Sequence, residues 1–129
     1  MKIIFLTLLA ALLAGCAGTR PYPVKLESDP PGARVFLSVG ATARQAAKNR
    51  SYLGQTPCTV EILGDGDGYF ELPKAAYVSS YVAGSATFIA EPPSGATNLF
   101  PKSVTYRGKS GYQEGDRIPA AVFFDLHKR

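Results

Sequence analysis

Residues 58–62 read Cys-Thr-Val-Glu-Ile, and this stretch decides the expected fold. Its apolar and polar side chains alternate with a period of two, which places Cys58, Val60 and Ile62 on one face of a β-strand. Other short runs of β-rich composition occur along the chain: residues 24–28, 33–38, 69–72, 86–90, 103–106 and 121–126. The repeated pattern predicts a mainly β protein.

Turn residues separate these runs, since the chain contains 13 glycines and 10 prolines. Short strands divided by frequent turns are typical of a small, mainly antiparallel β-sandwich. One segment breaks the pattern, because Ala41–Asn49 is rich in alanine and its Thr42 and Gln45 have the spacing of a helix capping box. We expect one short helical insertion there, and Ala75–Ala83 is a second candidate for a helix.

Length and charge narrow the classes of function. The chain has 129 residues, and about 114 remain once an N-terminal leader is removed, which is one small domain. This excludes dinucleotide-fold enzymes and multi-domain machines. The formal net charge is +4, but the basic residues are scattered along the chain without a run of like charges. A nucleic acid would find no basic patch, so no such partner is expected.

The first residues have the composition of a secretory leader. Lys2 supplies a short positive region, and Ile3–Leu13 is apolar apart from one threonine. The small residues Ala14 and Gly15 follow. A membrane-spanning helix needs about 20 apolar residues, so this run is too short to serve as one. Residues 1–15 are therefore expected to be a signal peptide that is removed from the mature protein.

Residues 13–16, Leu-Ala-Gly-Cys, resemble the lipobox of bacterial lipoproteins. In that family the cysteine thiol receives a diacylglyceryl group, the leader is cut before it, and the new amine is acylated, typically with palmitate. The resemblance implies lipidation at Cys16, with several acyl chains that hold the protein stably to a membrane. Ala17 rather than aspartate follows the cysteine, which in Gram-negative lipoproteins implies the outer membrane and a domain facing the periplasm. The alternative is an ordinary signal peptide followed by an unrelated cysteine.

A short tether is expected between the anchor and the folded domain. We place the tether at residues 16–23 and a single β domain at residues 24–129. The seven residues Ala17–Pro23 reach about 23 Å when fully extended, and Pro21 and Pro23 favour that extended form. The domain is therefore expected to sit close to the bilayer.

Two turn motifs precede strands in the first half of this domain. They are Pro30–Ala33, which reads Pro-Pro-Gly-Ala, and Leu53–Pro57, which reads Leu-Gly-Gln-Thr-Pro. Together with Ser28 and Gly68–Tyr69, these motifs resemble the PEGA domain, a small β module of many bacterial surface and exported proteins. The resemblance covers residues 24–75.

The chain departs from the PEGA pattern at two places. Pro31 stands where the name motif has glutamate, and the longer segment Val39–Tyr52 replaces a hairpin of the family. The resemblance implies a structural or interaction module at the envelope. It implies no catalytic site, and no ligand of the family can be assigned to particular residues here.

The sequence offers few groups for catalysis or metal binding. His127 is the only histidine, so a zinc site or a cysteine–histidine dyad has no ligand set. Cys58 is expected to point inward as a small buried hydrophobe. We therefore expect no catalytic residues, no metal and no cofactor.

Several acidic residues leave alternatives open. Asp65 and Asp67 lie in a Gly-Asp-Gly-Asp-Gly run that faintly resembles a calcium loop, but the glutamate that such a loop needs is missing, so a hairpin turn is favoured. Glu114, Asp116 and Asp125 support a second hypothesis, a small lipid-anchored cell-wall hydrolase. No cleft is predicted around these three residues, so a solvated surface role is favoured for them.

Tyrosine is the most suggestive remaining residue type. Tyr77 and Tyr81 are four residues apart, and Tyr106 and Tyr112 flank a glycine-rich loop that carries basic residues. Aromatic rings beside cations bind sugars or protein partners, and packing in the core also explains such residues. A third hypothesis is an inhibitor that presents the loop 108–115 to a foreign enzyme.

The sequence as a whole favours a non-catalytic protein of the bacterial cell envelope. The expected partners are the membrane, through the lipid anchor, and an envelope protein or peptidoglycan that the β domain binds or braces.

Overall fold

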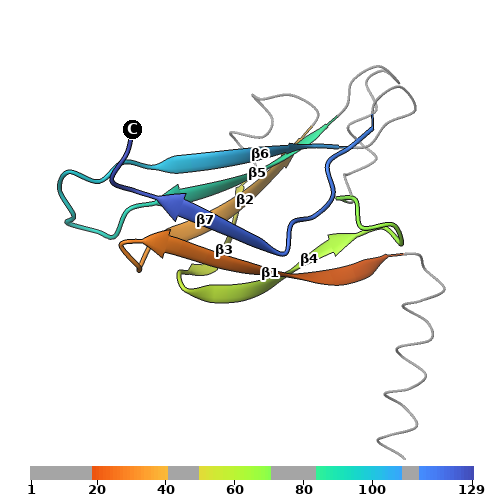
Figure 1. Ribbon diagram of the computed structural model, residues 1–129, viewed down its shortest axis with the longest axis horizontal. Coiled ribbons are helices and arrows are strands. Elements are labelled where there is room, and N and C mark those ends of the chain that lie inside the picture. Colours follow the sequence, from red (N-terminus) through yellow and green to blue (C-terminus); the bar gives the residue numbers. More distant parts are fainter. Residues whose placement is uncertain (1–18, 41–49, 71–83, 109–113) are drawn as a thin grey trace, which may run out of the picture.

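The computed structural model describes residues 19–40, 50–70, 84–108 and 114–129. Seven strands lie within these ranges (Figure 1): β1 (Arg20–Asp29), β2 (Arg34–Gly40), β3 (Arg50–Gln55), β4 (Cys58–Gly64), β5 (Ser85–Glu91), β6 (Lys102–Arg107) and β7 (Ala121–Asp125). The predicted helical insertion at Ala41–Asn49 and the second candidate at Ala75–Ala83 lie outside the described residues. Within the described ranges, no helix has the length and apolar character needed to cross a membrane.

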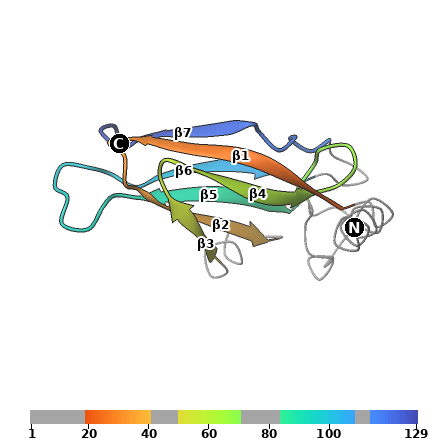
Figure 2. The same cartoon turned by 90° about the horizontal axis from the view of Figure 1, so that it is seen from below.

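The strands form two sheets that pack face to face, as Figure 2 shows from the side. One sheet has the strand order β4-β1-β7 and the other has the order β3-β2-β5-β6. Adjacent strands are antiparallel, except that β1 and β7 run parallel, with Lys25 opposite Ala121 and Asp29 opposite Asp125. This arrangement confirms the predicted mainly antiparallel β-sandwich.

The core lies between the two sheets and is built from alternate residues of each strand. On β5, Ala86, Phe88 and Ala90 are fully buried, while the residues between them are partly exposed. The Phe88 ring meets Phe70 and Tyr106 edge to face, with ring centroids 6.2 and 5.9 Å away. The buried apolar side chains of the described ranges are Val24, Leu26, Ala33, Val35, Ile62, Phe70, Ala86, Phe88, Ala90, Val122, Phe124 and Leu126. The period of two in the sequence is therefore the period of burial.

The first strand begins four residues earlier than predicted, at Arg20 rather than Val24, so the last residues of the expected tether belong to the sheet. Lys25 donates its backbone N–H to the Ala120 carbonyl oxygen on the β7 side (2.9 Å). The backbone groups of residues 21 and 23 point to the same side of β1 as those of Lys25, because backbone groups alternate along a strand. The ladder with β7 begins only at Lys25, so no strand lies beside β1 on this side at Pro21 and Pro23. The missing N–H groups of the two prolines therefore cost no hydrogen bond, and the strand continues through both.

The strand β3 was not predicted as a strand. Its residues were divided between the expected insertion, Val39–Tyr52, and the turn motif, Leu53–Pro57. A shift in register between Val35 and Phe36 on β2 lets β3 pair although Gly54 lies within it. In the predicted run 69–72, the described residues Tyr69 and Phe70 make isolated bridges to Arg117 and Gly64 instead of a strand.

Candidate functional site

The outer face of the four-stranded sheet carries an apolar cluster with one exposed ring. Phe36 on β2 and Ile89 on β5 are register partners, and both point away from the core. Tyr52 on β3 lies opposite Phe36, and their rings meet edge to face with centroids 5.5 Å apart. Tyr52 is 58% exposed. Apolar ring surface on a folded face is therefore available to another molecule.

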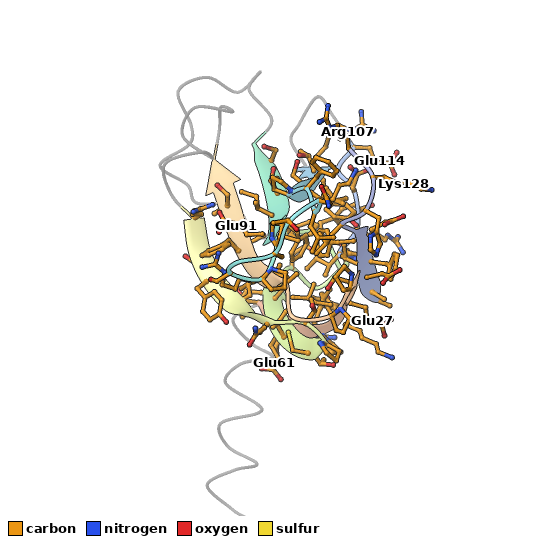
Figure 3. All side chains as sticks on the ribbon, turned by 90° about the vertical axis from the view of Figure 1, so that its left-hand side faces the viewer. Glu27, Glu61, Glu91, Arg107, Glu114 and Lys128 are labelled. Atoms are coloured by element: carbon orange, nitrogen blue, oxygen red, sulfur yellow. The ribbon has the colours of Figure 1, made fainter. Side chains whose placement is uncertain are left out.

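Two arginines converge on this cluster. The Arg50 guanidinium lies 4.4 Å from the centroid of the Phe36 ring, which is cation–π distance. Arg50 Nη1 also contacts Glu91 Oε1 at 2.7 Å, and Arg34 Nη2 lies 3.4 Å from Glu91 Oε2. Figure 3 shows Glu91 on this sheet and Glu27 on the opposite layer. The single carboxylate of Glu91 is thus held between two guanidinium groups.

We call this surface the arginine–aromatic face, and its members are Arg34, Phe36, Arg50, Tyr52, Ile89 and Glu91. It has two cations for one carboxylate, so it carries an excess of one positive charge. Arg34 Nε is buried without a hydrogen-bond partner, which leaves a donor unsatisfied. The surface combines a planar donor group, a cation and an exposed ring, which suits a ligand that has a carboxylate and a flat or apolar part.

Of the four candidate tyrosines, Tyr106 lies within the described ranges, and it belongs to the core. The Tyr106 ring packs on Phe70 and Phe88, and burial, aided by the negative charge of Asp116, raises the pKa of its hydroxyl. Packing in the core, rather than ligand binding, is therefore the role of Tyr106. The residues Tyr77, Tyr81 and Tyr112 lie outside the described part of the chain, and so does most of the loop 108–115.

The acidic residues of the hydrolase hypothesis are not gathered at one place. Asp116 Oδ2 accepts the backbone N–H of Arg107 at 2.8 Å and lies 3.8 Å from its Nε. Glu114 is exposed near the same end of the molecule, where Figure 3 labels it close to Arg107. Asp125 is at the other end of β7, beside Asp29. Asp125 therefore cannot act together with Glu114 and Asp116 on one bond.

The Asp65–Asp67 segment forms the predicted hairpin turn. Asp65 donates its backbone N–H to the Tyr69 carbonyl oxygen at 2.9 Å. One carboxylate oxygen of Asp65 accepts the N–H groups of Asp67 and Tyr69 at 2.9 and 3.0 Å. Glycine is required at position 64, because a Cβ there would lie 2.7 Å from the Tyr69 carbonyl oxygen. Across the described ranges, no three His, Cys, Asp or Glu side chains are grouped as metal ligands.

The remaining candidates are Cys58, His127 and Cys16. Cys58 is half-buried and packs against the core, and this burial raises the pKa of its thiol. The inward register of β4 was therefore predicted correctly, although its first residue stays partly accessible. His127 is exposed, with Nε2 3.5 Å from Asp29 Oδ1. Cys16, the predicted lipidation site, lies outside the described residues.

The two turn motifs that carry the PEGA resemblance meet in one hydrogen-bonded corner, which we call the Thr56 corner. Thr56 is buried, and its Oγ1 accepts the backbone N–H groups of Gly32 and Ala33 at 3.1 and 3.0 Å. Ser28 Oγ donates its only proton to the Pro30 carbonyl oxygen at 2.8 Å. The Thr56 hydroxyl therefore donates to Ser28 Oγ, which completes its hydrogen bonds.

The arginine–aromatic face cannot be predicted from the sequence alone. Its members are single residues on three strands, and no motif joins them. A weak signal was present in the run 33–38, where Phe36 occupies a position of the opposite parity to Val35 and Leu37. A large ring at an outward position indicates an exposed apolar surface.

Comparisons with protein-family models, with curated proteins and with solved structures found no match to this chain. Function must therefore be inferred from the residues themselves.

Proposed function

We propose that this chain is a lipid-anchored protein of the bacterial envelope whose β domain binds another envelope component without catalysing a reaction. The observation that carries the proposal is the arrangement of Arg34 and Arg50 around Glu91, beside the exposed Tyr52 ring. The leader with its lipobox supports the anchor, and the PEGA resemblance supports an interaction module. The component is a carboxylate-bearing protein or the peptidoglycan.

Arginine and aromatic residues are the side chains that contribute most to binding energy at protein interfaces. On this face the guanidinium of Arg50 is held over the Phe36 ring, so it loses little conformational freedom when a ligand binds. A carboxylate that reaches Arg34 and Arg50 would share them with Glu91. Bidentate pairing of this kind is directional as well as strong.

The position of the face within the domain also supports the proposal. The ten-residue strand β1 is about 30 Å long, and Arg34 begins β2 immediately after the turn that follows β1. In Figure 1 the start of β1 and this turn lie at opposite ends of the sandwich. If the anchor is joined to the start of β1, Arg34 is presented at the end remote from the membrane.

The first test removes both cations of the face. The tagged full chain, solubilised in detergent, is incubated with purified cell-wall sacculi and separately with envelope protein extract. We expect the variant Arg34→Ala with Arg50→Ala to lose at least tenfold in retention, or about 1.4 kcal/mol of binding free energy. Lys25→Ala is the matched control, because Lys25 is an exposed cation on the opposite sheet. Undiminished retention of the double variant on both materials would show that this face is not the binding site.

The second test concerns the anchor. In cells that express the full chain, the unsubstituted protein is expected in the membrane fraction with acyl chains on residue 16, and Cys16→Ala is expected to lose the lipid mass and to keep its leader, because the modification needs the thiol. Fractionation followed by mass spectrometry of the mature N-terminus measures both the location and the mass of the lipid. A mature N-terminus of the unsubstituted protein that carries no lipid mass would contradict a lipid anchor at this residue.

A further inference from the structure

A second surface, separate from the arginine–aromatic face, lies where the two sheets meet at β6 and β7. Both are edge strands: within the described structure β6 pairs only with β5, and β7 pairs only with β1. No ladder of hydrogen bonds joins β6 to β7 in the described structure. Between them runs a groove of about 170 Å³, with Val104, Phe123 and Phe124 among the residues that line it.

The hydrogen bonds at the end of β6 show which of its backbone groups face this groove. Gly108 donates its N–H to the Gly84 carbonyl oxygen on the β5 side at 2.7 Å. Because backbone groups alternate from side to side along a strand, those of Arg107, Thr105 and Ser103 point away from β5. The contacts of Arg107 confirm this parity, since its N–H and its carbonyl oxygen both bond to Asp116.

The backbone groups of β7 alternate in the same way. Leu126 donates its N–H to the Asp29 carbonyl oxygen at 3.0 Å, and the Ala120 carbonyl oxygen accepts from Lys25 at 2.9 Å. Even-numbered residues of this strand therefore face β1, and the backbone groups of Phe123 face the groove. Phe123 is also 59% exposed. Both walls of the groove thus present backbone donors and acceptors as well as apolar surface.

The chain itself closes the groove at both ends. At one end Asp116 occupies the open edge of β6 at Arg107. At the other end Phe100 donates its N–H to the Leu126 carbonyl oxygen at 2.9 Å. The open window on β6 therefore consists of Ser103–Thr105, which is long enough for a short extended segment and too short for a full strand of another sheet.

The charged residues of the groove indicate which kind of peptide segment would bind there. Lys102 lines it and makes no ion pair with any residue in the described ranges. Lys128 lines it too, is 81% exposed, and lies 3.8 Å from Asp125, the acidic residue of the lining. Two cations face one carboxylate. An acidic side chain on the incoming segment would neutralise this excess, whereas a basic one would be repelled.

We propose that the groove between β6 and β7 binds a short, extended, acidic segment of a partner protein by adding it to the open edge of β6. The backbone of the segment pairs with Ser103 and Thr105. Val104 and Lys102 lie on the same face of β6, two residues apart. The side chains that the segment presents to this face are therefore an apolar one, which packs on Val104, and an acidic one two residues away, which faces Lys102 and Lys128. Addition of a strand gives affinity through the main chain and specificity through alternate side chains.

The test uses the full chain and synthetic peptides as probes. The acetylated, amidated hexapeptide Thr-Val-Thr-Glu-Thr-Val, which carries valine and glutamate on one face when extended, is titrated while amide signals of the labelled protein are recorded. We expect saturable binding, shifts of the amides of Ser103 and Thr105, and at least tenfold slower hydrogen exchange at these two amides. The peptide with lysine in place of the glutamate should bind at least tenfold more weakly. The fully N-methylated form of the glutamate peptide should also bind at least tenfold more weakly, because its backbone has no N–H to donate.

One protein variant completes the test. Lys102→Glu should weaken binding of the glutamate peptide at least tenfold, whereas Lys25→Glu, an equal change of charge on the outer face of the other sheet, should not. The proposal is overturned if the N-methylated peptide binds as well as the glutamate peptide, or if the lysine peptide does. It is equally overturned if binding leaves the Ser103 and Thr105 amides unchanged, or if no binding is detected at millimolar peptide.

Discussion

Phe88→Ala is expected to lower the free energy of unfolding by about 3–5 kcal/mol, the range for removing a buried aromatic ring. Phe88 is fully buried at the centre of β5, and its ring contacts the rings of Phe70 and Tyr106. The alanine leaves a cavity between the sheets, because β5 is fixed on both edges by β2 and β6 and cannot move to fill it.

Urea unfolding followed by circular dichroism measures this change. Phe123→Ala is the matched control, since it removes the same side chain from a position that is 59% exposed on β7. We expect the control to cost less than about 1 kcal/mol. If the two variants unfold at the same urea concentration, the placement of the core between the sheets is wrong.

Thr56→Val is expected to cost about 2–4 kcal/mol, although valine has nearly the same shape as threonine. The hydroxyl of Thr56 accepts the N–H of Ala33 and of Gly32 and donates to Ser28. Gly32 keeps a bond to the Thr56 carbonyl oxygen, but the buried N–H of Ala33 loses its partner, and Ser28 loses a donor. Each unsatisfied buried group costs about 1–3 kcal/mol.

Thr56→Ser separates the hydroxyl from the methyl group. It keeps every hydrogen bond of the Thr56 corner, so its loss of stability should be well below that of Thr56→Val in the same urea titration. Valine and serine variants of equal stability would show that the methyl group, and not the hydrogen bonds, holds the corner together.

The strands that could be predicted from the sequence are those whose burial alternates. Residues 58–62 and 121–126 follow the period of two, and each forms a strand with the expected inward face. β3 could not be predicted in this way, because all six of its residues are partly buried or exposed on an edge strand and Gly54 suggests a turn. Its pairing depends on β2, and single-sequence periodicity carries no information about which strand lies beside it.

The candidate site was harder to predict for a related reason. Arg34 and Glu91 are neighbours only because β2 and β5 pair antiparallel in one register. Arg50 joins them from a segment that was expected to be an insertion. A surface assembled from distant strands leaves no local pattern, whereas the turn motifs at Thr56 were visible because the residues of each motif are consecutive.

The parallel pairing of β1 with β7 has a consequence for how the protein reaches its destination. A chain that leaves the ribosome or threads through a membrane pore with its N-terminus first delivers β1 early and β7 late. Until residues 121–126 emerge, one edge of β1 has no partner, and the core lacks the buried side chains of Val122, Phe124 and Leu126. The domain therefore cannot complete its fold before its last strand has crossed the membrane, which suits a polypeptide that is exported in an unfolded state.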